Sequence, residues 1–561
     1  MTDIRVQQGI NLESEISLIT IPIPFNKNVD TLLRLIGSFH PIFIKSYTYE
    51  KNLTIKSHLT SLWREIGTVL IKLSNEEITY EKAKELCVDE IIRERISSMS
   101  TIPLLFTSHS MGLETTPTLL LDERVTYTKA YNRHYTIGTG RNSQIIYSIS
   151  SSMDSKIAKE VQKDKWSSNL MISRLGLPIP KWEVVDNVSE LERIWGQYQK
   201  PVVIKPTGLV GGHGVVVGIE TIEEARKAFK FAQDACNTNM RKEWQQKIMI
   251  QEQIKGEDYR LLVINGKLEI ATKRIPAFIV GDGKHSIEDL IIETNKDPRR
   301  DISNPSHTLK PIVIDQPLRE YLKQQNLTLA SIPTKEEKIY VRKVASMSQG
   351  GITEDFTDKV GPEIKAIVES LATSIHAFTL GVDVMCQDIS KPLTKENGAI
   401  LEYNTMPEAY LNMYPVIGKQ REYVFKKYLE ALTKENRTKQ IVVVGNSSKD
   451  IPTLLRQKTF FSSYIGDNDT IGEYKNGEIK INGLDINKDL EKWKAIEGLK
   501  VNASLDAIII HHRDWEDVQE SGLGFDRIDM LLVAKELTSQ KEFSIIKKYQ
   551  RRKYINKIKI F

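Results

Sequence analysis

The sequence predicts a multidomain protein that combines α/β and α+β architecture. Its 561 residues exceed what one hydrophobic core can organise, so two to four domains are expected. Hydrophobic residues make up 40% of the chain and charged residues 27%, which is ordinary for a globular protein. Short β-branched runs alternate with glycine-containing turns and with segments of helical periodicity, as in residues 201–232.

Composition and charge exclude several functional classes. No apolar run is long enough to cross a bilayer, and residues 1–15 lack the basic-then-apolar layout of a signal peptide. The three cysteines, Cys87, Cys236 and Cys386, are too far apart for a disulfide framework or a metal motif. The net charge is only +5, and no basic–aromatic recognition motif accompanies it. We therefore expect a cytoplasmic protein without a membrane or nucleic-acid partner.

A glycine-rich turn separates two β-branched runs in PVVIKPTGLVGGHGVVVG, residues 201–218. An ordinary hairpin is one interpretation of this pattern, and a flap over phosphates is the other. It is not a Walker loop, because no GK[ST] opens a helix. Lys205 ends the first run, where its ammonium could reach a phosphate, and glycines let backbone N–H groups approach an anion closely. A capping box from Thr221 to Glu224 then predicts a helix. The order strand, loop, strand, helix favours the flap.

Candidate metal ligands lie on two strands further along the chain. LLVINGKLEIA predicts a hairpin around Asn265-Gly266. LGVDVMCQDI and GAILEYNTMP then predict a strand pair, with Asp383 on the first strand. Glu402 and Asn404 are two residues apart on the second, so they face the same way. Each residue alone would usually be a solvated strand residue. Together they offer hard oxygen ligands suited to Mg²⁺ that bridges ATP phosphates.

The order of these features resembles the ATP-grasp family. A flap lysine is followed by a hinge segment, a ribose-binding acid and an Asp…Glu-x-Asn set. More narrowly, residues 256–300 and 329–363 are similar to the ATP-grasp domain of cyanophycin synthetases. The same stretch is similar to the glutathione-synthetase half of bifunctional glutathione enzymes. The resemblance covers roughly residues 135–435 and implies an ATP-grasp fold that uses ATP and Mg²⁺.

The resemblance also implies a role for each matching residue. ATP phosphates would be held by Lys165 and Lys205. The flap would comprise Gly211, Gly212, His213 and Gly214. Adenine would meet the hinge from Gln251 to Ile254, and the ribose would meet Asp258. Mg²⁺ would be held by Asp383, Glu402 and Asn404. Catalysis would involve Lys205, Arg260 and Arg274, which face the reacting phosphoryl and carboxylate groups. The substrate carboxylate would be cradled by Ser346, Ser348, Gly350 and Gly351.

Three positions depart from the family pattern. The flap has His213 where arginine is usual, and the hinge opens with Gln251 where glutamate is usual. The segment after the metal-binding asparagine is usually small and contains glycine, whereas here it reads TMPEAYLNMYP, residues 405–415. The first two departures bear on nucleotide affinity. The third bears on the identity of the substrate.

The two ends of the chain carry fewer signals. Residues 1–150 predict an N-terminal α/β domain. By analogy with cyanophycin synthetases, this domain would help to dock the substrate. Residues 151–436 would form the ATP-grasp domain. Residues 437–561 open with the strand–loop–helix pattern QIVVVGNSSKDIPTLL and resemble the start of a Mur-ligase domain. Asp450 replaces the hydroxyl residue expected to bind Mg²⁺ there, and His512 replaces a glutamate. We therefore expect a truncated, inactive Mur-ligase-like α/β domain.

These features lead to one principal hypothesis. An ATP-dependent ligase would activate a carboxylate as an acyl phosphate and join it to an amine in a peptide or isopeptide bond. By resemblance this is the aspartate-adding half-reaction of cyanophycin synthesis or a related reaction on amino acids or peptides. A glutathione-synthetase-like or N-acetyl-dipeptide ligase is an alternative within the same chemistry. A non-catalytic nucleotide-binding scaffold is the rival from another class. The family also implies a homo-oligomer, either a dimer or a tetramer.

Overall fold

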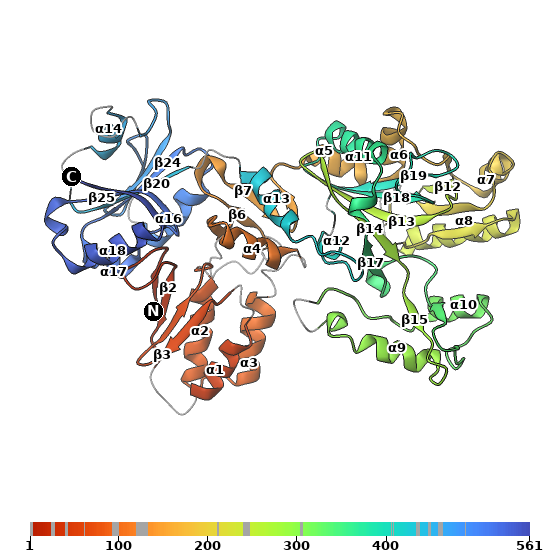
Figure 1. The fold of residues 1–561 in the computed structure, drawn as a ribbon, viewed down its shortest axis with the longest axis horizontal. Coiled ribbons are helices and arrows are strands. Elements are labelled where there is room, and N and C mark those ends of the chain that lie inside the picture. The colour runs from red at the N-terminus through yellow and green to blue at the C-terminus, as the bar shows by residue number, and fades with distance from the viewer. Residues whose placement is uncertain are drawn as a thin grey trace. The chain divides into compact units, whose positions relative to one another are not determined.

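The computed structural model describes residues 4–23, 29–39, 43–60, 62–92, 100–118, 133–209, 212–238, 247–302, 307–405, 407, 409–433, 438–446, 450–457, 464–487 and 490–561. The chain forms two compact units. Unit 1 contains residues 1–148 and 425–561, and unit 2 contains residues 149–424. The two ends of the chain therefore share one unit, and the central residues form the other (Figure 1). The predicted division at 1–150, 151–436 and 437–561 stays a prediction.

Unit 2 contains a four-stranded antiparallel sheet in the order β11-β10-β12-β9. Its strands are β9 (Trp182–Val185), β10 (Val202–Pro206), β11 (Val216–Ile219) and β12 (Ile248–Glu252). Helices α7 (Val188–Trp195) and α8 (Ile222–Thr238) bury apolar side chains against it. Thr221 Oγ1 accepts a hydrogen bond from the Glu224 N–H, and the Glu224 carboxylate accepts one from the Thr221 N–H. The predicted strand, loop, strand, helix order and the capping box are confirmed.

A second antiparallel sheet of unit 2 has five strands in the order β17-β14-β13-β18-β19. They are β13 (Glu257–Ile264), β14 (Lys267–Ile275), β17 (Ile352–Asp355), β18 (Thr379–Cys386) and β19 (Gly398–Asn404). Helices α5 (Lys156–Gln162), α6 (Lys165–Arg174) and α11 (Pro362–Ser374) contribute to the core on one face. Asn265 and Gly266 both have positive φ, at 49° and 71°, which confirms the predicted hairpin.

A smaller lobe of unit 2 precedes β17. It contains the hairpin of β15 (Phe278–Val280) and β16 (Lys338–Tyr340), with helices α9 (Ile287–Asn295) and α10 (Gln316–Gln324). Buried residues of both helices and both strands, including Ile287, Leu318 and Ile339, form its own core. Residues 346–351 then lead into β17, and the short helix α12 (Tyr410–Met413) follows β19.

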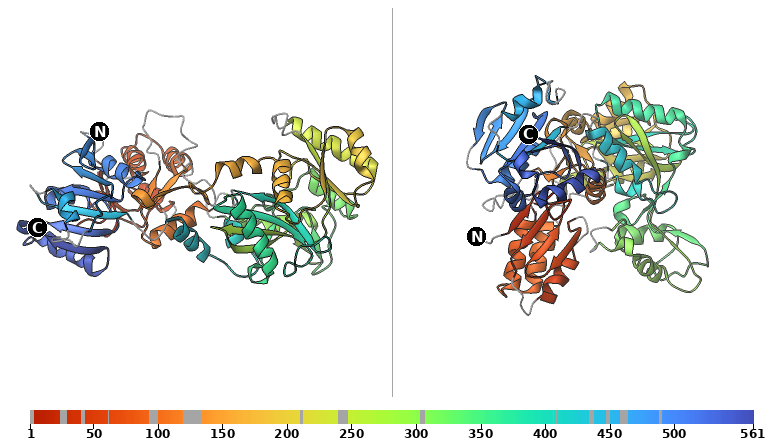
Figure 2. Two further views of the ribbon diagram at one scale, coloured as in Figure 1. Left: turned by 90° about the horizontal axis from the view of Figure 1, so that it is seen from above. Right: turned by 60° about the vertical axis from the view of Figure 1, so that its left-hand side comes forward.

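The N-terminal part of unit 1 is a small mixed structure. Its first sheet is antiparallel in the order β1-β2-β4-β3, formed by β1 (Arg5–Gln7), β2 (Leu18–Ile21), β3 (Ser46–Tyr49) and β4 (Leu53–Lys56). Helix α1 (Val29–Gly37) lies between β2 and β3 in the chain, and helices α2 (Leu62–Ser74), α3 (Tyr80–Lys84) and α4 (Thr101–Ser110) come after β4. These elements are drawn in red to orange (Figure 2). A second antiparallel sheet includes β5 (Thr115–Pro117), β6 (Tyr135–Ile137) and β7 (Gln144–Tyr147). Leu62, Ile66 and Leu70 recur at helical spacing in α2, and all three are buried.

The C-terminal part of unit 1 is a seven-stranded sheet in the order β23-β22-β21-β24-β20-β25-β26. Strands β21 (Ile471–Lys475), β24 (Ala507–His512), β20 (Lys439–Val444), β25 (Ile528–Val533) and β26 (Ile555–Ile560) are parallel, and β22 (Glu478–Ile481) and β23 (Leu484–Asn487) are antiparallel. The helices are α13 (Tyr423–Thr433), α14 (Ile451–Arg456), α16 (Lys492–Val501), α17 (Trp515–Ser521) and α18 (Lys541–Arg551). The predicted strand and helix of residues 440–455 are confirmed in β20 and α14, whereas the Mur-ligase likeness stays a prediction. Residues 447–449 lie outside the described ranges.

Backbone hydrogen bonds join the two parts of unit 1. The Ile10 N–H donates to the Phe525 carbonyl, and the Leu523 N–H donates to the Ile10 carbonyl. The Gly524 N–H donates to the Gln8 carbonyl. The backbones approach so closely that a Cβ on Gly9, whose φ is +66°, would lie 2.2 Å from the Phe525 carbonyl oxygen. Gly9 and the segment SGLGFD, residues 521–526, therefore contact each other closely through their backbones.

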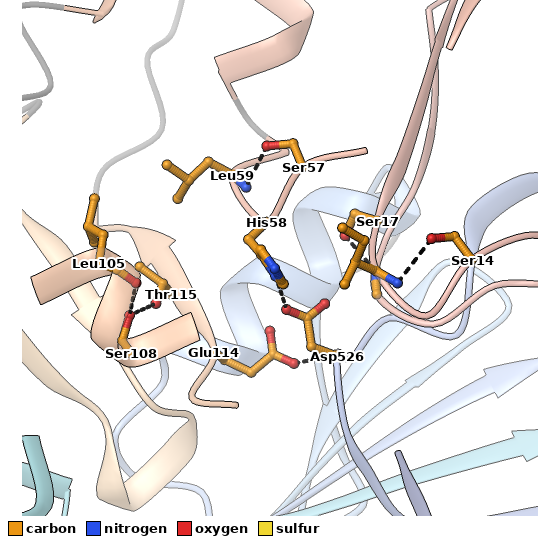
Figure 3. Close-up of polar contacts among 12 residues, drawn as sticks. Ser14, Ser17, Ser57, His58, Leu59, Leu105, Ser108, Glu114, Thr115 and Asp526 are labelled. Carbon is orange, nitrogen blue, oxygen red and sulfur yellow. Dashed lines mark hydrogen bonds and ion pairs between the residues drawn. The ribbon is translucent and has the colours of Figure 1, made fainter. Parts of the chain in front are cut away.

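Buried charged side chains reinforce this joint. His58 Nδ1 lies 3.0 Å from Asp526 Oδ2, and Glu114 Oε1 accepts a hydrogen bond of 2.6 Å from the Asp526 N–H (Figure 3). The other Glu114 oxygen is 2.9 Å from Lys500 Nζ. Burial would raise the pKa of Asp526, but the hydrogen bond and charge of His58 hold it below its ordinary value. Residues 58, 114, 500 and 526 thus form one ionic network across the joint.

Replacement of Gly9 by alanine should lower the melting temperature of the protein by several degrees. A side chain at this position needs a left-handed backbone and clashes with backbone atoms, so we expect a loss above about 1 kcal/mol. Gly37→Ala is the control, because a Cβ there meets no atom within 4 Å. The measurement is differential scanning calorimetry. Equal melting of the two variants would contradict the close contact.

Glu497 should make the stability of unit 1 fall as the pH rises through neutrality. Its side chain is buried, Gln8 Nε2 donates to Oε1, and Oε2 has no hydrogen-bond partner. Burial raises its pKa from 4.5 to about 7. Between these values the folded protein binds one more proton than the unfolded chain, so this stabilisation is present at low pH and lost as the pH rises through 7. The melting temperature of Glu497→Gln should decrease less between pH 5 and pH 7 than that of the wild type. Parallel melting curves would contradict the assignment.

Candidate functional site

Charged side chains gather on one face of the five-stranded sheet in unit 2. In the strand register Arg260 pairs with Asp383, and Asp383 pairs with Glu402. Asp258 lies opposite Arg274 on β13 and β14. Successive side chains of a strand point to opposite faces, so the intervening residues, such as Leu261 and Val382, enter the core. The sheet therefore holds several predicted site residues side by side.

Two arginines contact the deeply buried Asp383, which is 3% exposed. Arg260 Nε lies 2.5 Å from Asp383 Oδ1, and Arg274 Nη2 lies 3.1 Å from Oδ2. The 2.5 Å contact lacks hydrogen-bond alignment, so Oδ1 has no hydrogen-bond donor. Burial raises the pKa of Asp383 to about 6, although both arginines act to lower it. Asp383 Oδ1 is thus a buried acceptor that still lacks a hydrogen-bonding partner.

Two lysines approach the same carboxylates from other elements. Lys205 Nζ on β10 donates a 2.7 Å hydrogen bond to Gln251 Oε1, and burial lowers the pKa of Lys205 to about 8. Lys165 Nζ lies 4.0 Å from Glu402 Oε2. Burial would raise the pKa of Glu402, but the charges of Lys165 and Lys205 hold it at about 2. Lys165, Lys205 and Glu402 therefore interact electrostatically in one place.

The remaining predicted residues have different environments. Arg274 donates to Asp258 Oδ1 from Nε and Nη2, at 3.1 Å and 2.6 Å, so this carboxylate already has a cationic partner. The Gln251 side chain reaches Lys205, and Ile254 is half-buried between β12 and β13. Gly212 and Gly214 have φ of 80° and 73°, and His213 between them is exposed. Gly211 lies outside the described residues.

The predicted carboxylate-binding loop lies at the edge of this sheet. Ser346 and Ser348 are hydrogen-bonded to each other through their hydroxyls at 2.9 Å, and the Gly351 N–H donates to the Ser346 carbonyl. A Cβ on Gly351 would lie 2.9 Å from the carbonyl oxygen of Ile275, the residue after Arg274. In the described residues, no hydrogen bond or ion pair joins either serine to the charged cluster. The loop is therefore adjacent to the strand of Arg274.

Sequence reasoning missed Gln162 at the end of α5. Its Nε2 donates to Asn404 Oδ1 at 3.0 Å, and its Oε1 accepts from the N–H and the hydroxyl of Thr405. These contacts fix the direction in which the Asn404 amide points. No pattern in the sequence relates two residues that are 242 positions apart.

The residues of the predicted Mg²⁺ set fit that ion. Asp383 Oδ1 lacks a donor, Glu402 is ionised, and an amide oxygen of Asn404 is fixed by Gln162. Mg²⁺ commonly uses one or two carboxylates together with substrate phosphates. Over the described ranges, no group of three or more His, Cys, Asp or Glu side chains is arranged to hold a metal. A two-carboxylate set that is completed by phosphate oxygens agrees with both observations.

Part of this chain is similar to known proteins. Residues 162–275 match the family model described as phosphoribosylglycinamide synthetase, ATP-grasp (A) domain. The chain contains an ATP-grasp domain. The predicted ATP-grasp fold is thereby confirmed, and the matched range contains the Lys205 strand, the flap and the strands of Arg260 and Arg274.

The ATP-grasp domain is similar to two groups of curated proteins. The cyanophycin synthetase of Crocosphaera subtropica is 33% identical over 325 residues, which is 57% of this chain and 36% of the relative. The glutathione biosynthesis bifunctional protein of Clostridium perfringens is 30% identical over 276 residues, 48% of this chain and 34% of that protein. The chain thus spans about a third of the length of these relatives. A solved bifunctional glutathione synthetase from Pasteurella multocida aligns with 65% of this chain and 49% of its own at 22% identity and a TM-score of 0.45.

Gln162→Ala should weaken Mg²⁺-dependent nucleotide binding by about tenfold. The change frees the Asn404 amide, and loss of a residue that orients a metal ligand typically costs 10- to 100-fold in affinity. The measurement is the Mg²⁺ concentration at which a fluorescent ATP analogue is half bound. Gln233→Ala on the exposed face of α8 is the control and should behave as wild type. A normal Mg²⁺ requirement for Gln162→Ala would show that Gln162 does not position a metal ligand.

Proposed function

We propose that this protein is an ADP-forming ATP-grasp ligase that joins a carboxylate to an amine. Its product would be a peptide or isopeptide bond between amino acids or peptides. The observation that carries this proposal is the convergence of four cations, Lys165, Lys205, Arg260 and Arg274, with Asp383 and Glu402 on one sheet face. The similarity to cyanophycin synthetases supports it, although the chain spans only part of those proteins.

The cations have distinct tasks in this proposal. Lys165 and Lys205 bind the ATP phosphates, and a buried lysine acts more strongly on them than an exposed one would. Arg260 and Arg274 face the phosphoryl group and the carboxylate oxygen that attacks it, a step that yields the acyl phosphate and ADP. The bound amine then displaces phosphate, and Arg274 offsets the oxyanion that forms. Mg²⁺, held by Asp383, Glu402 and Asn404, would neutralise charge on the transferring group.

The glycine flap completes this scheme. Gly212 and Gly214 adopt positive φ, and a Cβ on Gly214 would lie 2.7 Å from the Pro206 side chain. The flap binds phosphate through backbone N–H groups and excludes water, which would otherwise hydrolyse the acyl phosphate. His213 takes the place of the usual arginine, so a weaker cation lies at this point of the flap. The predicted homo-oligomer, dimer or tetramer, and the cytoplasmic location stay predictions.

Activation should produce ADP and a trappable acyl phosphate. The protein, ATP, Mg²⁺ and hydroxylamine are mixed with each member of a panel of free amino acids and dipeptides. At least one carboxylate should give a hydroxamate together with ADP. Formation of AMP and pyrophosphate would overturn the activation step, and absence of both products with every carboxylate would favour a non-catalytic nucleotide-binding scaffold.

The same assay distinguishes Lys205 from an ordinary surface lysine. Lys205→Ala should lose at least about 100-fold in hydroxamate formation, as expected when one transition-state charge contact is removed. Lys230→Ala on the exposed face of α8 is the matched control and should change the rate by less than about twofold. Thermal melting of both variants excludes unfolding as the cause. A near-normal rate for Lys205→Ala would contradict the site assignment.

A further inference from the structure

A cavity of about 370 Å³ lies in unit 2, next to the predicted carboxylate-binding loop. Most of its wall is apolar and includes Phe278, Leu290, Ile352 and Val416. The lining also has four charged residues, which are Glu293, Asp297, Arg299 and Arg300. These residues come from β15, α9, β17 and the segment after α12. The volume falls in the range of cavities that bind small ligands. Val416 directly follows the TMPEAYLNMYP segment, the part of the chain that departs from the family pattern.

One buried cation, Arg300, lines this cavity without an ion pair at contact distance. Arg300 is 6% exposed, and its Nη1 donates to the carbonyl oxygens of Lys310 and Gly350, the latter at 3.1 Å. Across the described ranges, no carboxylate oxygen lies within 4.0 Å of its guanidinium nitrogens. The neighbouring Asp297 uses both oxygens on Arg299, at 3.1 Å and 2.7 Å. Asp297 acts on Arg300 only through its charge at longer range, and a buried charge without a close partner is costly, so an anion at contact distance would stabilise Arg300.

Arg300 also connects the cavity to the predicted substrate loop. It holds the carbonyl of Gly350, a residue whose φ is +92° and whose Cβ would lie 2.6 Å from the Ile312 side chain. Gly351, the next residue, packs against the backbone after Arg274. The loop thus has the cavity on one side and the strand of Arg274 on the other.

The chemistry of ligation suggests which substrate needs such a cation. The reacting carboxylate gives up its charge when it becomes an acyl phosphate. An amino acid that enters through its amine keeps its α-carboxylate ionised throughout the reaction. It therefore needs a permanent cationic partner, and a guanidinium remains charged at all physiological pH values.

We propose that this cavity binds the amine substrate, and that this substrate is an amino acid with an apolar side chain. The side chain lies among Phe278, Leu290 and Val416, and the α-carboxylate pairs with Arg300. This assignment rests on the proposed ligase function and adds the class of its second substrate. An acidic amino acid fits less well, because a second carboxylate would meet apolar side chains and the carboxylates of Glu293 and Asp297.

Calorimetric titration of the full chain with ADP and Mg²⁺ bound tests the proposal. The probes are leucine, methionine, phenylalanine, leucinamide and aspartate. At least one of the three apolar amino acids should bind, and at least tenfold more tightly than aspartate. If leucine binds, leucinamide should bind at least tenfold more weakly because it lacks the carboxylate. Tighter binding of aspartate, or no binding of any apolar amino acid at 10 mM (roughly the weak end of specific binding), would overturn the proposal.

Two variants locate the binding. Val416→Trp fills the cavity and should abolish binding of the preferred amino acid, whereas Arg300→Gln should reduce it at least tenfold. Arg319→Gln on the exposed face of α10 is the control and should bind normally. Normal binding by Val416→Trp would overturn the assignment to this cavity. Hydroxamate formation is measured in parallel. If hydroxamate forms but the preference for apolar amino acids is absent, only the assignment of this cavity is wrong. If the wild type forms no hydroxamate with any carboxylate, the proposed ligase function is wrong.

Discussion

The register between β13, β18 and β19 is the constraint on which the central unit depends. It sets Arg260 beside Asp383 and Asp383 beside Glu402, while alternate residues such as Leu261 and Val382 enter the core. A shift of one residue would turn the charged side chains into that core and the apolar ones to the other face. The hydrophobic core and the charged face therefore specify the same register, so the packing that stabilises the fold also assembles the candidate site.

The charged face carries an imbalance that suits a polyanionic ligand. Four cations, Lys165, Lys205, Arg260 and Arg274, face three carboxylates, Asp258, Asp383 and Glu402, which leaves one positive charge in excess. The arginines contact the carboxylates directly, and Lys205 contacts the neutral Gln251. A glutamate at position 251 would remove the excess charge. Because position 251 is glutamine and not the usual glutamate, the closest hydrogen-bond partner of Lys205 is neutral.

The sequence allowed local features to be predicted, but it did not reveal contacts between distant residues. The capping box at Thr221, the Asn265-Gly266 turn and the strand pair of Asp383 and Glu402 follow from short-range patterns, and the structure confirms them. Gln162 and Asn404 are separated by 242 positions, and Arg300 and Gly350 by 50, so no periodicity connects them. The roles of individual site residues came from family resemblance, because a lysine at the end of a strand is chemically ordinary until its neighbours are known.

The polar residues at the joint of unit 1 form structural contacts. In the SGLGFD segment, the Gly524 N–H donates to the Gln8 carbonyl and Asp526 pairs with His58. Nearby, His512 is buried, and burial keeps its pKa well below the ordinary value, so a neutral imidazole accepts from Lys492. Asp450, at the start of α14, accepts from the Thr453 hydroxyl. These polar groups form contacts within the fold, and we infer that packing between the two ends of the chain, rather than nucleotide chemistry, accounts for their arrangement.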